Sequence, residues 1–298
     1  MNEAQIAIKL EKLTKSYGQT RGIEDLSFNV FAGEVFGFLG PNGSGKTTAI
    51  RTILGLIKPS AGSMMILGTP SIARNIKIRN RIGYLPGIAA TYENYTALGY
   101  LKFIARMRGL KLDLEIRELA ARLNLDLTGH IHDLSKGNRQ KVSLIQAFMH
   151  KPELLLLDEP TSGLDPLVQR EFEIMLEEVK SRGAAVLLSS HILSEVEHLA
   201  DRVAILDKGR AIAIDEVAAL KARARRRIEI TFESKVSREA FNNVPNIAEI
   251  EIKENTLACW VAGSERELLK QALSEGLISI RTEESSLEEI FLDLVSQE

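Results

Sequence analysis

The sequence predicts an α/β protein built on a mostly parallel sheet flanked by helices and followed by a small α+β domain. Three observations support this expectation. Strand-like and helix-like segments alternate in the central part of the chain, a helical pattern interrupts them over about residues 88–150, and short alternating strands follow residue 219. Strands that alternate with helices are typical of a parallel sheet covered on its faces.

The N-terminal part predicts strands over 6–10, 23–31 and 35–39, with the turn residues Ala32 and Gly33 before the last of them. Apolar residues then recur at helical spacing in Leu98, Leu101 and Ile104, which predicts that 88–150 forms a helical insertion. The alternating pattern resumes afterwards. We expect strands over 154–157, 185–188 and 203–206, and helices over 168–179 and 193–199.

A change of character near residue 220 predicts two domains, 1–219 and 220–298, separated by the basic run 221–227, which we interpret as a solvated linker. The second domain has the order strand, helix, strand, strand, helix, strand, then a closing helix. The ranges are 228–234, 236–243, 247–253, 256–262, 264–274 and 277–282. This β-α-β-β-α-β order is the ferredoxin-like arrangement.

The composition excludes several classes of protein. Lys and Arg total 38 against 40 for Asp and Glu, so the net charge of -2 gives no general attraction to nucleic acid, and we expect no such partner. A single cysteine, Cys259, excludes an internal disulfide framework. No stretch approaches the roughly 18 consecutive apolar residues of a membrane-spanning helix, and the charged N-terminal stretch does not fit a secretion signal. We therefore expect a cytoplasmic protein.

The strongest local signal is a glycine-rich stretch after the third predicted strand, which matches the pattern G-x-x-x-x-G-K-[ST]. Its glycines allow backbone N–H groups to surround phosphate oxygens at a helix N-terminus. Lys46 is expected to reach the β and γ phosphates of ATP, and Thr47 to hold Mg²⁺. The predicted ATP-binding residues are Gly40, Pro41, Asn42, Gly43, Ser44, Gly45, Lys46, Thr47 and Thr48.

A second signal is the apolar run Leu154–Leu157, which ends in Asp158 and Glu159. Ligands of parallel sheets lie at the carboxyl ends of the strands, where these acids fall. Asp158 is suited to contact Mg²⁺, and Glu159 is suited to polarise an attacking water. Two acids that merely begin a surface turn are the alternative, which becomes weak beside a phosphate loop.

Together with further short motifs, these residues resemble the ATP-binding cassette (ABC) ATPases over about residues 5–218. Leu134–Asn138 is similar to the family signature L-S-G-G-Q, Ser162–Asp165 to its D-loop, and His191 to its switch histidine. Tyr17 matches the aromatic residue that stacks on adenine in this family. The signature residues are Ser135, Lys136, Gly137 and Asn138.

The resemblance implies a P-loop core with an antiparallel β subdomain and a helical insertion. It also implies a mechanism that needs two cassettes, arranged head to tail so that ATP on Lys46 of one faces Ser135 and Gly137 of the other. Glu159, His191 and Lys46 are then the catalytic residues, and Asp165 belongs to the D-loop. We expect a homodimer or a heterodimer with a related chain, acting at the inner face of the cell membrane on a separate integral-membrane permease.

The sequence also departs from the family pattern. Gly87 stands where the family usually has a glutamine that contacts Mg²⁺ and water, and Lys136 and Asn138 replace signature residues. The Tyr-Leu-Pro-Gly and Leu-Ser-Lys-Gly-Asn-Arg-Gln variants and the ending Ser286–Leu292 resemble the exporter-type (ABC-2-like) branch. A soluble ABC ATPase of ribosomes or DNA and a regulatory module that binds ATP without hydrolysing it are the alternative functions. A kinase with the same phosphate loop would leave the signature and D-loop unexplained.

Four of the five tyrosines, Tyr84, Tyr92, Tyr95 and Tyr100, lie in the stretch where transporters of this family receive a helix of the membrane subunit. Two interpretations remain open at this point. They form an aromatic groove for that helix, or they pack the core of the helical insertion.

Overall fold

The computed structural model describes residues 5–18, 20–70, 75–88, 92, 94–283 and 285–296. These residues form two compact units, 1–214 and 215–298. The division falls a few residues before the boundary expected at 219/220.

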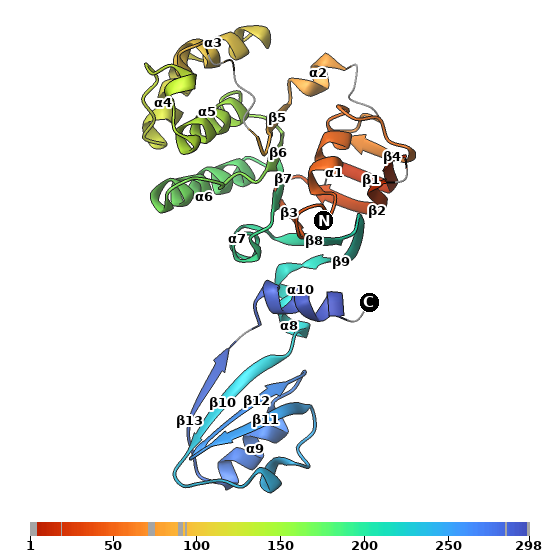
Figure 1. Ribbon diagram of the computed structural model, residues 1–298, viewed down its shortest axis with the longest axis vertical. Helices are drawn as coiled ribbons and strands as arrows, with labels where there is room; N and C mark the ends of the chain where they lie inside the picture. The colour runs from red at the N-terminus through yellow and green to blue at the C-terminus, as the bar shows by residue number, and fades with distance from the viewer. Residues whose placement is uncertain are drawn as a thin grey trace. The chain divides into compact units, whose positions relative to one another are not determined.

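A six-stranded sheet in the order β5-β6-β7-β3-β8-β9 forms the centre of the first unit (Figure 1). Four neighbouring pairs, from β5-β6 through β3-β8, are parallel. Its strands are β3 (Val35–Leu39), β5 (Ile82–Leu85), β6 (Leu154–Asp158), β7 (Ala185–Ser190), β8 (Arg202–Asp207) and β9 (Arg210–Glu216). Every residue of β3, β6 and β7 is buried, as expected for strands covered on both faces.

A separate antiparallel sheet in the order β2-β1-β4 confirms the β subdomain that the resemblance implies. Its strands are β1 (Ile6–Tyr17), β2 (Thr20–Phe31) and β4 (Ala61–Ile66). These first two strands extend further toward residues 17–20 than the apolar runs predicted, since residues 11, 12 and 14–17 of β1 are mostly polar and gave no apolar signal. Its buried residues join one hydrophobic core with β3, β6 and helix α1 (Lys46–Ile53).

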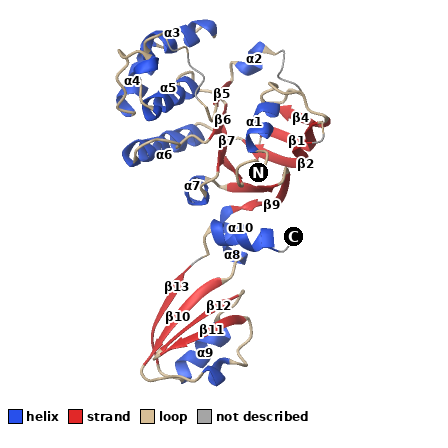
Figure 2. Cartoon of the chain, in the orientation of Figure 1, coloured by secondary structure: helices blue, strands red, loops and turns tan. Residues whose placement is uncertain are grey.

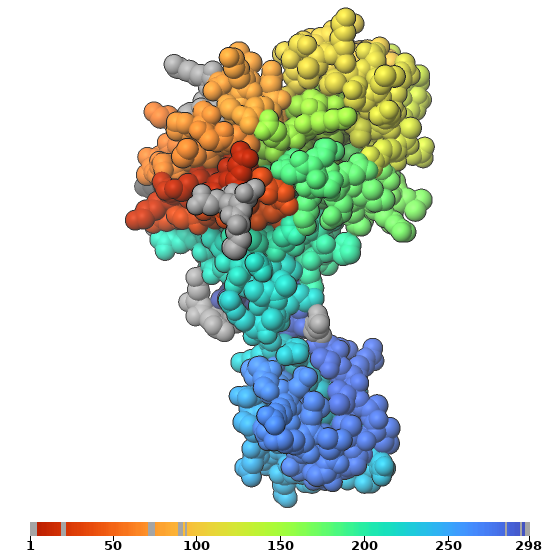
Figure 3. Space-filling model, turned by 180° about the vertical axis from the view of Figure 1, so that it is seen from behind, coloured from red at the N-terminus to blue at the C-terminus, as the bar shows by residue number. Residues whose placement is uncertain are grey.

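Helices occupy the predicted insertion, which forms a closely packed lobe of the first unit (Figure 3). They are α3 (Ala97–Met107), α4 (Asp113–Arg122), a short 3₁₀ turn (Ile131–Asp133) and α5 (Lys136–Phe148). The remaining helices of this unit are α2 (Ile76–Arg79), α6 (Pro166–Ser181) and α7 (Leu193–Leu199). Thr96, Ser135 and Asp165 cap α3, α5 and α6, each accepting a backbone N–H through its side chain.

The second unit contains an antiparallel four-stranded sheet in the order β11-β12-β10-β13 (Figure 2). Its elements are α8 (Val217–Arg223), β10 (Arg226–Phe232), a 3₁₀ turn (Arg238–Phe241), β11 (Ile247–Lys253), β12 (Thr256–Val261), α9 (Arg266–Ser274), β13 (Leu277–Glu283) and α10 (Leu287–Ser296). Both order and pairing agree with the ferredoxin-like expectation.

Two expectations for the second unit need correction. The helix expected over 236–243 is only the 3₁₀ turn Arg238–Phe241, which buries Phe241 against Phe232. The basic run 221–227 is not a linker, since it forms the end of α8 and the start of β10. The apolar residues Val217 and Ile228, both buried, fix these two elements on either side of the run.

Candidate ATP-binding and catalytic site

The phosphate loop joins the end of β3 to the start of α1, and its glycines adopt backbone conformations that other residues avoid. Gly40 has φ 149° and Gly45 has φ 106°. A Cβ on Gly40 would clash with the carbonyl oxygen of Leu206, and one on Gly45 with that of Gly22. The loop therefore needs glycine at both positions, for backbone conformation and for space.

Lys46 begins α1 and is almost buried, with its Nζ donating hydrogen bonds to the carbonyl oxygens of Gly40 (2.6 Å) and Pro41 (3.1 Å). Burial lowers the pKa of the ammonium, and the carboxylates of Glu159 and Asp158 oppose this shift. The charge is thus held inside the loop at a helix N-terminus, where an anion is favoured by both the dipole and the free amides.

Ser44 contributes a second feature to the loop. Its hydroxyl oxygen is buried and has no hydrogen-bond partner among the described residues. Buried hydroxyls nearly always have a partner, so this one is suited to a ligand oxygen or water.

Asp158, at the end of β6, connects this loop to the neighbouring strand. Its Oδ2 accepts a hydrogen bond from Thr47 Oγ1 (2.9 Å), and its Oδ1 accepts one from Ser189 Oγ at the end of β7 (2.5 Å). Gly87 lies against the same carboxylate, because a Cβ there would be 3.3 Å from Asp158 Oδ2. The structure thus places a residue without a side chain beside the acid where the family usually has glutamine.

Glu159 is paired with His191, whose Nδ1 lies 2.9 Å from Glu159 Oε1. The backbone of Glu159 is in the left-handed region, at φ 51°, and its N–H donates to the carbonyl of Ser189. Its side chain remains 29% exposed, which leaves the carboxylate open to water. A carboxylate paired with a histidine beside a phosphate loop is suited to activating water for attack on phosphorus.

Tyr17 and Thr48 converge on Gly22, where a Cβ would be 3.0 Å from Tyr17 Cε2 and 2.9 Å from Thr48 Cγ2. The tyrosine ring is 47% exposed, and Lys15 Nζ lies 5.1 Å from its centroid. An exposed ring beside the phosphate loop offers the apolar face that stacking on a base requires.

The signature and D-loop residues contact each other. Ser135 caps α5, and a Cβ on Gly137 would be 2.6 Å from the carbonyl oxygen of Gly163. Lys136 Nζ donates to Ser162 Oγ (3.4 Å), whereas Asp165 caps α6. The signature turn therefore lies along the D-loop of its own chain.

The sequence analysis missed Ser189, Gln140 and Glu195. Glu195 Oε2 accepts hydrogen bonds from Thr161 Oγ1 (2.7 Å) and Ser190 Oγ (3.0 Å), which joins the segment after Glu159 to the segment before His191. The available signals were the serine pair at the end of a buried strand and the motif Leu-Ser-Lys-Gly-Asn-Arg-Gln, which ends in Gln140. The contacts themselves depend on how β6, β7 and α5 pack together.

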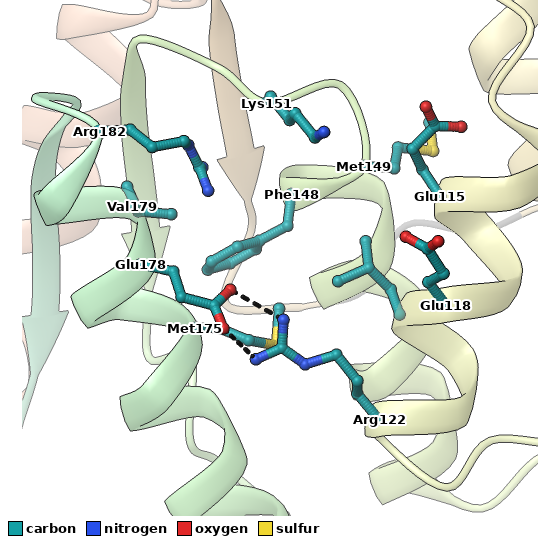
Figure 4. Close-up of a pocket in the computed structure, with 11 residues that line it drawn as sticks. Glu115, Glu118, Arg122, Phe148, Met149, Lys151, Met175, Glu178, Val179 and Arg182 are labelled. Carbon is teal, nitrogen blue, oxygen red and sulfur yellow. Dashed lines mark hydrogen bonds and ion pairs between the residues drawn. The ribbon is translucent and has the colours of Figure 1, made fainter.

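A hollow of about 260 Å³ lies elsewhere in the first unit, between α4, the end of α5 and α6 (Figure 4). Phe148 and Met175 line it, and Arg122 crosses it to form a two-pronged ion pair with Glu178 (2.8 and 2.9 Å) and a bond to Glu171 (2.5 Å). This arginine therefore ties the helical insertion to a helix that packs on the central sheet.

The fold and the site define a P-loop nucleotide-binding protein. Residues 23–162 match the ABC transporter family. The chain is 33% identical to the bacitracin transport ATP-binding protein BcrA of Bacillus licheniformis, over 97% of each chain. It is 34% identical to a Nod factor export ATP-binding protein I of Rhizobium meliloti, over 98% of this chain and 89% of the relative. The chain belongs to the ATP-binding subunits of ABC transporters, and it is an ATPase.

Solved structures agree with this assignment. An ATP-binding subunit of an ABC transporter superposes with a TM-score of 0.67 at 32% identity, covering 72% of this chain and 92% of the other. A dimeric bacterial ABC transporter cassette has a TM-score of 0.66 at 23% identity, covering 70% of this chain and 98% of the other, which supports the fold alone. The predicted family, fold class and ATPase activity are confirmed, and the transporter subunit is favoured over the ribosomal, DNA-acting and regulatory alternatives.

Proposed function

We propose that this chain hydrolyses ATP to drive export through a separate membrane-spanning permease. The arrangement of Glu159 and His191 beside the phosphate loop is the observation that carries the hydrolytic part. The names of the relatives, which are for bacitracin transport and Nod factor export, support the export part. Within the described residues, no helix has the length and apolar character needed to cross a bilayer. A permease would supply that span, and the chain would act on the cytoplasmic face of the membrane.

We propose that Thr47 and Asp158 hold Mg²⁺. Their oxygens, 2.9 Å apart, are a hydroxyl and a carboxylate, the hard donors that this ion prefers, and both lie beside the phosphate loop. Bound there, the ion would neutralise charge on the phosphates. The short bond from Ser189 to Asp158 keeps this carboxylate oriented toward Thr47.

For hydrolysis, Lys46 and the loop amides hold the phosphates of ATP in place, and Glu159 accepts a hydrogen bond from the attacking water. Proton transfer from water to Glu159 accompanies attack on the γ-phosphorus, and ADP leaves with the electrons of the cleaved bond. His191, bonded to Glu159, fixes the direction of that carboxylate.

Ser135, Lys136, Gly137 and Asn138 are proposed to meet ATP that is bound to a second cassette, in a homodimer or a heterodimer. The backbone N–H groups in the first turn of α5 point past the N-terminal end of the helix. Ser135 Oγ accepts one of them, the N–H of Asn138, at 3.2 Å. Remaining amides of such a turn favour an anion. Asp165 caps the neighbouring helix and would lie at the same interface.

The permease is proposed to dock on the exposed part of an aromatic cluster on the helical insertion. Tyr92 and Tyr95 are 59% and 41% exposed, and both rings contact Phe103. Tyr100 is instead buried and bonds Gln146 (2.6 Å), and Tyr84 packs against the sheet core. Tyr100 therefore fits packing of the insertion, Tyr84 fits neither interpretation, and Tyr92 and Tyr95 support the proposed docking surface. We propose residues 1–219 as the ATP-binding domain and 220–298 as an accessory domain.

The experiment is affinity purification of the tagged chain from detergent-solubilised membranes of its own cells. Mass spectrometry identifies what co-purifies, and the complex is assayed for ATP hydrolysis. A stoichiometric polytopic membrane protein, with ATPase activity lost in a Lys46→Ala variant, is the expected result. Ribosomal or DNA-repair proteins in its place would overturn the transport proposal while leaving the ATPase assignment intact.

A further inference from the structure

Gln140 lies in the second turn of α5 and is 5% exposed. Its amide nitrogen Nε2 donates to the carbonyl oxygens of Glu159 (3.2 Å) and Pro160 (2.9 Å). These two carbonyls belong to the peptide bonds on either side of Pro160. A single buried side chain therefore holds the main chain immediately after the carboxylate proposed to activate water.

Glu159 needs such support because its backbone is strained. A non-glycine residue in the left-handed region is disfavoured by contact of its Cβ with the backbone, and it persists only when its surroundings fix it. The N–H of Glu159 is fixed by Ser189 of β7, and its carbonyl is fixed by Gln140. With its N–H and its carbonyl both held, the Cα–Cβ bond of Glu159 points in one direction, which orients the carboxylate.

The same helix contacts the next residues of this segment. Gly137 packs on the carbonyl of Gly163, and the aliphatic part of Lys136 lies 3.6–3.7 Å from the position of a Cβ on Gly163. Lys136 also reaches Ser162. The first turns of α5 thus follow the chain from Glu159 to Gly163, and Gln140 makes the contact closest to the carboxylate.

We propose that Gln140 is a positioning residue for Glu159, and that it connects the helix that begins at the signature to the water-activating carboxylate of the same chain. The inference rests on the proposed function only for the role of Glu159. The alternative is that Gln140 satisfies the hydrogen-bonding capacity of two buried carbonyls and contributes only to stability. The two interpretations predict different results for a Gln140 variant. Loss of positioning lowers kcat while the affinity for nucleotide stays unchanged, whereas loss of stability alone does not.

Gln140→Glu keeps the size of the side chain but replaces the donor with a carboxylate that faces two carbonyl oxygens. Gln140→Met keeps the volume without a donor or a charge, and it carries the test if the glutamate variant does not fold. Gln169→Glu is the matched control, because Gln169 Nε2 makes one long bond (3.4 Å) to the carbonyl of Leu164, beyond the segment in question.

The full-length chain is assayed for kcat and KM with MgATP from pH 6 to 8, and deuterium uptake is followed over residues 158–163. Loss of a positioning contact is expected to lower kcat about tenfold or more in both Gln140 variants with KM within about twofold, since small misplacements of a reacting group are costly. Uptake is expected to rise in this segment. The control is expected to match wild type in both measurements.

The pH series separates positioning from stability. The deficit of the glutamate variant, expressed relative to wild type at each pH, should shrink as pH falls, because a protonated carboxyl can again donate to a carbonyl. The methionine variant should show no such relief. Unchanged uptake over 158–163, or an unchanged kcat, overturns the inference. A wild-type chain without ATPase activity would instead count against the proposed function, and unchanged deuterium uptake in the Gln140 variants would still overturn the role of Gln140.

Discussion

The imidazole Nδ1 of His191 lies 2.9 Å from the carboxylate Oε1 of Glu159. The two residues follow the ends of neighbouring parallel strands, β6 and β7, which pair in register from Leu154–Ala185 to Asp158–Ser189. Their meeting is thus a direct result of strand register.

Replacing Glu159 with Gln should leave ATP binding intact and lower the rate of hydrolysis by about 10²–10⁴-fold, because the amide cannot accept the proton of water. With hydrolysis slowed, the proposed ATP-bound dimer should accumulate. Light scattering with saturating MgATP measures the mass, and Glu173→Gln on α6 is the control. A variant that stays monomeric would exclude the homodimer.

Replacing His191 with Ala should lower kcat by about 10²-fold, since Glu159 loses the partner that orients it. The affinity for ATP should change little, because the phosphate loop is untouched. His198→Ala is the matched control, as its side chain is 73% exposed and lies 3.7 Å from Glu173. Equal rates in the two histidine variants would argue against a role for the pair in hydrolysis.

Replacing Gly87 with Ala should raise the Mg²⁺ concentration needed for half-maximal activity by up to about tenfold, near the lower end of what outer contacts of metal sites contribute. The added Cβ would be 3.3 Å from Asp158 Oδ2 and would displace that carboxylate. A magnesium titration of ATPase activity tests this. Gly129→Ala, with its nearest neighbour at 3.5 Å, should behave as wild type.

The ion pair of Arg122 and Glu178 predicts a pH-dependent stability. Arg122 lowers the pKa of the Glu178 carboxyl below 4.5, so the pair stabilises the folded chain above that pH and its contribution is lost as pH falls through the lowered pKa. Glu178→Gln should cost about 1 kcal/mol or less at pH 7, because the side chain is 48% exposed, and nothing below the lowered pKa. The free energy of unfolding in urea, measured at pH 7 and at a pH below the lowered pKa, tests this prediction. Glu177→Gln is the control.

Replacing Tyr95 with Glu should remove the stimulation of ATPase activity by the permease and leave the basal rate unchanged. A charge on an aromatic docking surface would have to lose its hydration on contact. Met107→Glu, at the end of α3 and 71% exposed in wild type, is the control. Preserved transport by the Tyr95 variant would exclude this surface.

The sequence predicted much of the fold because its signals are local. The apolar runs that became β3, β6 and β7 and the glycines of the phosphate loop each follow from short-range chemistry. The helix expected over 236–243 was wrong, since burying Phe241 against Phe232 favours a tighter turn. In the same way, the bonds of Gln140 to Glu159 and Pro160 and the bond of Glu195 to Thr161 join residues 19 to 34 positions apart, so no local pattern indicates these contacts.

Gly37 interrupts the buried strand β3 at a point where a Cβ would clash with Val196 of α7 and lie 3.0 Å from Val203 Cγ1. The side chain of Val196 lies directly against the backbone of the strand there, so neither element can slide without breaking close packing. In mechanical terms, β3 and α7 act as a rigid frame around the phosphate loop and His191. The partly exposed ion pairs of Arg122 connect the insertion to α6 outside this frame, and a substitution at Gly37 should loosen the frame itself.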